Sequence, residues 1–219
     1  MTGILRIDAF FDFICPWCLI GKRQLERALV ALRSSHPDVE LELAWHGVQL
    51  LPHLPAQGVP FVEFYRQRLG SAEAVQARQA QVRQAAAAVG LSIDFSGIKT
   101  MPNTADAHRL MECASELGSV AQRDALLERL FAAYFDQGKD LGDSATLLAI
   151  AESCGYPREA LVDCLEGAGS PYDDSGMGAR GVPYFIFNRR QAISGAQPAE
   201  VLLQAMQQAL AQDAAGSPA

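Results

Sequence analysis

Two cysteines, Cys15 and Cys18, lie where a strand-forming sequence changes into a helix-forming one. Residues 4–14 are rich in aromatic and β-branched side chains, and apolar residues recur at helical spacing after Cys18. Because the start of a helix stabilises a nearby anion, it favours the thiolate form of the first cysteine, Cys15. A pair placed in this way can close a disulfide and open it again, so thiol–disulfide chemistry is the leading hypothesis.

Two other uses of a Cys-x-x-Cys pair stay open. Tetrahedral zinc needs two further ligands, but the sequence has no second Cys-x-x-Cys and no Cys-x-x-His, and its four histidines are scattered singly. Buried cysteines can also serve as small apolar residues. Pro16, which suits the first turn of a helix, makes the inert interpretation the weakest. We therefore expect no metal site.

Composition limits the classes of function. The 219 residues are 49% hydrophobic, which suffices for a full core. The net charge of −7 and a pI near 5.1 argue against a nucleic-acid partner. The sequence has no run of 18 apolar residues, so we expect no membrane span. The N-terminal residues lack a basic region and an unbroken apolar stretch, so we expect no signal peptide and a cytoplasmic location. The oligomeric state is left open.

The order of predicted elements indicates an α/β fold. Strands over 4–14 and 39–48 flank a helix, and strands over 184–188 and 191–194 precede a final helix that begins at Pro198. Between them, from Phe61 to about Glu166, only helices are predicted. The expected architecture is therefore a thioredoxin-like β-α-β … β-β-α mixed sheet with a large all-helical insertion. The expected boundaries are 1–55 and 167–219 for the two parts of the sheet domain and 56–166 for the insertion.

Four segments resemble the DsbA-like branch of the thioredoxin superfamily, and more narrowly the cytoplasmic FrnE-type dithiol–disulfide oxidoreductases. They are DFICPWCLIGKRQLE at 12–26, PNTADAHRL at 102–110, YFDQGKDLGD at 134–143 and GVPYFIFNRRQAISGAQP at 181–198. The resemblance spans nearly the whole chain. It implies that Cys15 is the attacking thiolate, Cys18 the resolving thiol, and Pro183 a cis-proline facing them. A cis bond there would expose the backbone of Val182 to a substrate chain that adds by strand pairing.

One departure from the family concerns a buried carboxylate that many thioredoxin-fold enzymes carry on the first strand. The matching position here is Ala9, and the nearest acid, Asp12, falls on the other side of the strand. The sequence therefore leaves open whether Asp12 or water exchanges the proton of Cys18.

Three further residues are candidates for substrate contact. Trp17, between the two cysteines, would offer an apolar surface. His108 flanks the apolar face of its helix and is either a half-buried packing residue or a group near the active site. Asn103 is either a helix cap or a substrate contact.

The other three cysteines, Cys113, Cys154 and Cys164, are expected to be core residues, although Cys154 and Cys164 flank a short connection and could form a second redox pair.

Three functions compete. The leading one is a thiol–disulfide oxidoreductase acting on disulfide- or thiol-containing proteins or small molecules, with no bound cofactor. The second is a glutathione-dependent isomerase or transferase of the 2-hydroxychromene-2-carboxylate isomerase or kappa type, with glutathione as co-substrate. Such enzymes typically do not need the second thiol, so Cys18 discriminates against them. The third is a non-catalytic, chaperone-like binding module that uses Trp17.

Overall fold

The computed structural model describes residues 3–165, 172 and 181–216, with side chains up to Asp213. The chain begins with strand β1 (Ile4–Phe11), helix α1 (Pro16–Ser35) and strand β2 (Glu40–Gly47). β1 and β2 are parallel, with Ile4 opposite Glu40 and Phe11 opposite Gly47. The predicted β-α-β unit is thus confirmed.

A hairpin completes the sheet. Strand β5 (Tyr184–Phe187) pairs antiparallel with β1 on one side and with β6 (Gln191–Ser194) on the other, giving the strand order β2-β1-β5-β6. Asn188 and Arg189 turn the chain between β5 and β6 with positive φ angles of 47° and 55°. Two consecutive positive φ values match the twist of a tight hairpin. The predicted mixed sheet is confirmed.

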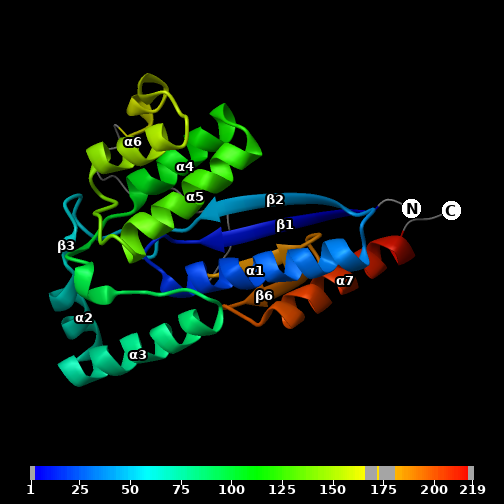
Figure 1. Cartoon of the computed structure of the whole chain (residues 1–219), viewed down its shortest axis with the longest axis horizontal. Helices are drawn as coiled ribbons and strands as arrows, with labels where there is room; N and C mark the ends of the chain where they lie inside the picture. The colour runs from blue at the N-terminus through cyan, green and yellow to red at the C-terminus, as the bar shows by residue number, and fades with distance from the viewer. Residues whose placement is uncertain (1–2, 166–171, 173–180, 217–219) are drawn as a thin grey trace. The chain divides into compact units, whose positions relative to one another are not determined.

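Helices α1 and α7 (Ala199–Gly216) pack on one face of this sheet and lie side by side in Figure 1. Alternate strand residues supply the buried face, because side chains along a strand point in turn to opposite sides. The sheet contributes Leu5, Ile7, Ala9, Phe185 and Phe187; the helices contribute Leu25, Ala28, Leu29, Leu32, Leu202, Ala205, Met206 and Ala209. This core fixes the start of α1 at the end of β1, where Cys15 and Cys18 are found.

The chain forms two compact units. The first contains residues 1–48 and 177–219 and holds the sheet, and the second contains residues 49–176. The boundary expected between residues 166 and 167 lies outside the described residues.

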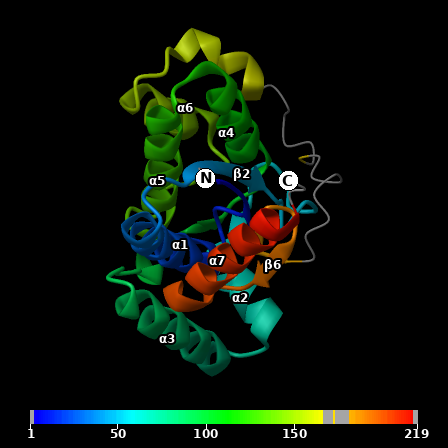
Figure 2. The same ribbon diagram turned by 90° about the vertical axis from the view of Figure 1, so that its right-hand side faces the viewer.

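The second unit is largely helical, as Figure 2 shows for α4, α5 and α6. Its elements are α2 (Phe61–Leu69), α3 (Ala72–Ala88), α4 (Ala105–Leu117), α5 (Val120–Phe135) and α6 (Ser144–Ser153), with 3₁₀ turns η1 (Phe95–Gly97), η2 (Arg158–Ala160) and η3 (Val162–Leu165). Side chains cap three helix starts: Ser71 for α3, Ser119 with Gln122 for α5, and Asp143 for α6. Each cap satisfies a backbone N–H that has no partner inside its helix.

One expectation about this unit is wrong. Strand β4 (Thr100–Met101) lies within the segment predicted to hold only helices, and it pairs antiparallel with β3 (Val59–Pro60). The backbone N–H of Phe61 also donates to the carbonyl of Lys99 over 2.9 Å. Two-residue strands are too short to show a period-two pattern, so only the long-range pairing defines them.

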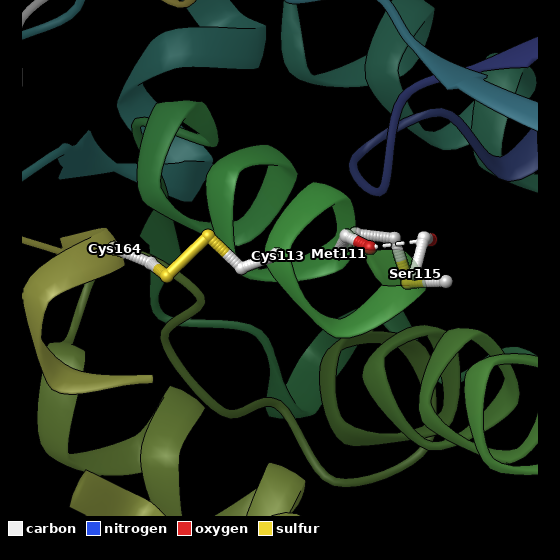
Figure 3. The surroundings of a disulfide bond; sticks show 4 residues. All are labelled: Met111, Cys113, Ser115 and Cys164. Carbon is white, nitrogen blue, oxygen red and sulfur yellow. Dashed lines mark hydrogen bonds between the residues drawn. A yellow bond between two sulfur atoms is a disulfide. The ribbon is translucent and has the colours of Figure 1, made fainter. Parts of the chain in front are cut away.

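The cysteines of the second unit also differ from expectation. Cys164 forms a disulfide with Cys113, not a pair with Cys154, which is free. Figure 3 shows the bond joining α4 to η3, beside the Ser115 hydroxyl that donates to the Met111 carbonyl over 2.7 Å. Both bonded cysteines are half-buried, so neither is the core residue that was expected. Cys164 pairs with Cys113 because η3 packs on α4, although Cys154 is nearer to Cys164 in the sequence.

Replacing both Cys113 and Cys164 with Ser should lower the free energy of unfolding of the second unit. The bond joins residues 51 positions apart, and the chain-entropy relation for a loop of that length gives about 4 kcal/mol. Denaturant unfolding under non-reducing conditions measures the loss, and Cys154→Ser is the matched control. Equal stability of the double variant and the control would show that this disulfide does not constrain the unfolded chain.

Candidate active site

The two cysteines of the first unit sit at the first turn of α1. Cys15 is the N-cap residue, and Pro16 occupies the first helical turn. The backbone N–H of Cys15 donates to the carbonyl of Asp12 over 3.1 Å, and that of Cys18 donates to the carbonyl of Cys15 over 3.0 Å. Both thiols are free, with Cys15 8% exposed and Cys18 2% exposed. Cys15 is thus the more accessible of the two thiols.

The loop before β5 faces Cys15. The Val182–Pro183 bond is cis, as predicted, and the Cys15 sulfur lies 3.8 Å from the carbonyl oxygen of Val182. Pro183 is buried, while Val182 and Trp17 are half-buried. Residues separated by 167 positions in the chain therefore meet at one point, and Cys15, Cys18, Val182 and Pro183 form one cluster.

Gly21, which was not predicted to matter, makes this approach possible. A Cβ atom at Gly21 would lie 2.9 Å from Cγ and 3.2 Å from Cβ of Pro183, and 3.3 Å from the ring of Phe185. Such distances are too short for ordinary packing, so α1 can lie against Pro183 only because this position lacks a side chain. A glycine one turn beyond Cys18, inside an otherwise regular helix, was the available signal.

The two thiols differ in their electrostatic surroundings. Burial raises the pKa of Cys18 well above its ordinary value, and the hydrogen bond with Cys15 and the charges of Cys15 and Asp12 raise it further. A backbone hydrogen bond from Asp12 opposes these effects. Since the hydrogen bond with Cys15 favours protonated Cys18, Cys18 is its donor and Cys15 its acceptor. Cys18 therefore holds its proton at neutral pH.

Asp12 completes the cluster. Its side chain is fully buried, and its Oδ1 accepts a hydrogen bond from the backbone N–H of Ile14 over 3.5 Å. Ala9 lies in the apolar core beneath α1 and α7. The buried carboxylate of this unit therefore belongs to the turn that leads into the cysteines.

Asn103 belongs to the second unit, and both ends of its amide hydrogen-bond to protein groups. Its Oδ1 accepts from the backbone N–H of Ala105 over 3.0 Å and from the side chain of Gln49 over 2.8 Å. Its Nδ2 donates to the carbonyl of Leu54 over 2.7 Å. The bond to Ala105 satisfies the start of α4, as expected for a capping residue, whereas Thr104, the N-cap itself, makes no side-chain cap bond.

His108 is also in the second unit, and it is buried rather than half-buried, with 1% exposure. Its ring stacks on Tyr172 with the centroids 5.2 Å apart, and the backbone N–H of Tyr172 donates to Gln49 over 2.8 Å. Gln49 and Tyr172 were not predicted, because their contact spans 123 positions and leaves no local pattern. Substrate contact by Asn103 and His108 stays a prediction.

Neither a metal cluster nor a membrane span is found in the described part of the chain. Among residues 3–165, 172 and 181–216, no group of three His, Cys, Asp or Glu residues could hold an ion. Among the described helices, none combines the length and apolar character that crossing a bilayer requires.

In the reduced protein, Cys18 should react with iodoacetamide only at high pH. The thiolate is the reactive form, and Cys18 keeps its proton beyond the pH at which an ordinary thiol, near 8.5, loses it. Mass mapping of labelled peptides across a pH series measures this, with Cys154 as internal reference. Poor access alone would lower the labelling rate of Cys18 by the same factor at every pH. A labelling rate of Cys18 that rises over the same pH range as that of Cys154 would therefore contradict the raised pKa.

Gly21→Ala should destabilise the protein by about 1–3 kcal/mol, because the new methyl group overlaps Pro183 and Phe185. Helix propensity alone would stabilise this variant by about 1 kcal/mol, so the sign of the change decides which effect is larger. Denaturant unfolding gives the value. Gly97→Ala, where a new Cβ meets nothing within 4 Å, is the matched control. A Gly21→Ala protein more stable than wild type would show that α1 and Pro183 can move apart freely.

The solved structure of a probable DsbA oxidoreductase from Streptomyces coelicolor is similar to this chain, with 28% identity, a TM-score of 0.81, and coverage of 98% of this chain and 92% of that one. The uncharacterized protein YwbO of Bacillus subtilis (strain 168) is 25% identical over 162 residues, 74% of this chain and 72% of YwbO. A 2-hydroxychromene-2-carboxylate isomerase shares the fold, with 16% identity, a TM-score of 0.62, and coverage of 97% of this chain and 100% of that one.

The family model of the DSBA-like thioredoxin domain matches residues 6–207, which include both cysteines, the cis-proline and all of the sheet except the first two residues of β1. The resemblance to the DsbA-like branch is therefore confirmed: this chain belongs to the DSBA-like thioredoxin domain family, the family of the DsbA-like thiol–disulfide oxidoreductases.

Proposed function

We propose that Cys15 and Cys18 are the redox pair of this oxidoreductase and that Cys15 attacks the substrate. The observation that carries the proposal is the asymmetry of the two thiols. Cys15 lies at the helix start, accepts a hydrogen bond from Cys18 and faces the carbonyl of Val182, whereas Cys18 is deeper and holds its proton. Cys15 is therefore placed to act as the nucleophile, and Cys18 is placed to react in the second step.

The reaction then runs in two exchanges. The Cys15 thiolate attacks one sulfur of a substrate disulfide, the substrate S–S bond breaks, and the electron pair leaves on the other substrate sulfur. The sulfur of Cys18 next attacks Cys15, the mixed disulfide breaks, and the second substrate thiol leaves. The substrate disulfide is reduced to two thiols, and Cys15 and Cys18 are oxidised to a disulfide. The reverse sequence introduces a disulfide into a substrate.

Val182 and Trp17 are the proposed substrate contacts. Val182 precedes β5 and brings its carbonyl to Cys15, so an extended substrate chain that pairs with this loop would carry its sulfur to the nucleophile. The half-buried indole of Trp17 adds an apolar surface. Both contacts suit a protein substrate as well as a small disulfide.

A glutathione-dependent isomerase is the second candidate, because an enzyme with that activity shares the fold. A single activating Ser or Cys is typical of that class, so the buried Cys18, hydrogen-bonded to Cys15, favours the oxidoreductase. The proposal needs no bound cofactor, and it assigns glutathione at most the role of co-substrate. It places the protein in the cytoplasm, where the glutathione pool sets the redox poise.

Cys15→Ala should abolish reduction of a peptide disulfide, because no nucleophile remains. Cys18→Ala should accumulate a covalent mixed disulfide between Cys15 and the peptide, because the resolving thiol is absent. Mass spectrometry under non-reducing conditions detects the adduct, and a coupled thiol assay measures turnover. Cys154→Ala is the control and should retain wild-type turnover.

Two outcomes would overturn this assignment. If Cys15→Ala accumulates the adduct and Cys18→Ala turns over, the two roles are reversed. If wild type reduces no disulfide tested, the chain acts without redox chemistry, as the chaperone-like alternative predicts.

A further inference from the structure

We propose that His46 is a positioning residue that fixes the loop before β5 in the place where this loop receives a substrate chain. Asp8 holds the imidazole, and the rings of Phe10 and Tyr184 connect it to the loop. This inference rests on the proposed function and deepens it, because it names what sets the affinity for extended substrates. The two exchanges use none of these four side chains.

The four side chains lie on one face of the sheet, near the end of β1 that leads into the cysteines. Phe10 of β1 is opposite His46 of β2 on one side and Tyr184 of β5 on the other. Ala9 faces the core beneath α1 and α7, so its neighbours Asp8 and Phe10 point to the other face. Directly opposed residues share a face, and the row His46, Phe10, Tyr184 therefore spans three adjacent strands.

A hydrogen bond fixes the imidazole at the start of this row. Nε2 of His46 lies 2.8 Å from Oδ1 of Asp8. A carboxylate only accepts hydrogen bonds, so Nε2 carries the hydrogen and donates it, whether the imidazole is neutral or charged. Both side chains are 31% exposed, so the imidazole has room to turn away without this bond. Asp8 therefore determines which orientation His46 presents to Phe10.

Ring contacts continue from His46 to Tyr184. The His46 and Phe10 rings are stacked, with centroids 4.9 Å apart and an angle of 24° between their planes. The centroids of the Phe10 and Tyr184 rings are 6.0 Å apart, and the rings are tilted by 55°. Phe10 is buried, and closely packed side chains transmit a displacement to their neighbours. A change at His46 therefore reaches Tyr184.

Tyr184 connects this row to the loop. It is the first residue of β5 and follows Pro183, which has no backbone N–H to donate. The carbonyl of Pro183 accepts the N–H of Gly195 over 2.8 Å, which anchors the loop toward β6. On the side of β1 the anchor is Tyr184. Its backbone pairs with Phe10 within the sheet, and its ring contact with Phe10 resists movement out of the plane of the sheet.

This anchor matters more for extended substrates than for small ones. The Val182 carbonyl, two residues before Tyr184, lies 3.8 Å from the sulfur of Cys15. An extended chain that pairs with the loop needs the loop in place, whereas a small disulfide needs only the thiolate. Loosening the loop should therefore weaken binding of a peptide disulfide and leave the attack by Cys15 on a small disulfide unchanged.

The same two strands offer a matched control. Arg6 of β1 pairs with Glu42 of β2, with Nε and Oε2 2.6 Å apart, on the same face as Asp8 and His46. This pair also links β1 to β2, but it lies toward the far end of the strands from the cysteines, and neither side chain carries a ring. If His46 only stabilised the sheet, Glu42→Ala would reproduce the effect of His46→Ala.

The experiment follows release of thionitrobenzoate by stopped flow in a Cys18→Ala, Cys154→Ser background. Of the five cysteines, Cys15 is then the one left free, so it makes a single attack. One substrate is dithiobis(2-nitrobenzoate), and the other is a linear peptide whose central cysteine carries the same leaving group. We expect His46→Ala to raise the peptide concentration that gives half the limiting rate about fivefold, which is within the range of an aromatic contact. The limiting rate, and the rate with dithiobis(2-nitrobenzoate), should match those of the background protein.

Further variants test the route from Asp8 to the loop. Tyr184→Ala should raise the same peptide concentration, and adding His46→Ala to it should change nothing more, because His46 then has no contact through which to act on the loop. Asp8→Ala should reproduce His46→Ala, whereas Asp8→Asn, which keeps an oxygen for the Nε2 hydrogen, should retain tight binding. If His46→Ala does not fold, the comparison of Asp8→Ala with Asp8→Asn tests the proposal.

The outcomes are distinguishable. If Cys15 attacks neither substrate, the proposed redox function fails, and this inference fails with it. If Cys15 attacks both, the redox function stands, and any of three results refutes the role of His46. His46→Ala binds the peptide as tightly as the background protein does, Glu42→Ala weakens binding equally, or the effects of His46→Ala and Tyr184→Ala multiply.

Discussion

The contact between α1 and Pro183 is the constraint on which the site depends. The helix supplies the two thiols, and the loop before β5 supplies the carbonyl that faces Cys15, yet they are far apart in the chain. Hydrophobic packing of α1 and α7 on the sheet brings them near each other, and the bare backbone of Gly21 lets them touch. The position of the nucleophile is therefore set by the core of the first unit, and the loop alone does not determine it.

The two cysteines differ in their surroundings more than in their exposure. The exposure of Cys15 and Cys18 differs by only a few per cent of their surface, yet Cys18 is enclosed with its neighbours and Cys15 borders the loop. A low-dielectric environment penalises the charged form of whichever group it surrounds. A short turn therefore places two chemically identical side chains in different electrostatic surroundings, which suits them to the different roles proposed for them.

Much of the first unit could be predicted from the sequence. The strand-forming sequences over 4–14, 39–48, 184–188 and 191–194 and the helix start at Pro16 are local signals, and each appears in the structure. The features that were missed come from contacts between distant residues: the packing of Gly21 on Pro183, the β3–β4 pair, and the bond of Tyr172 to Gln49. No local pattern encodes such contacts. The buried state of Asp12 was missed for a related reason, because a polar residue in a turn is ordinarily exposed.

The Cys113–Cys164 disulfide determines whether a protease cut in the second unit releases a fragment. It closes a covalent ring that contains α5 and α6. One protease cut between these helices opens the ring without releasing a fragment, because the disulfide still joins both sides of the cut. The pieces separate only after a reductant acts. A nicked chain of this protein would thus migrate as one species without reductant and as two with it.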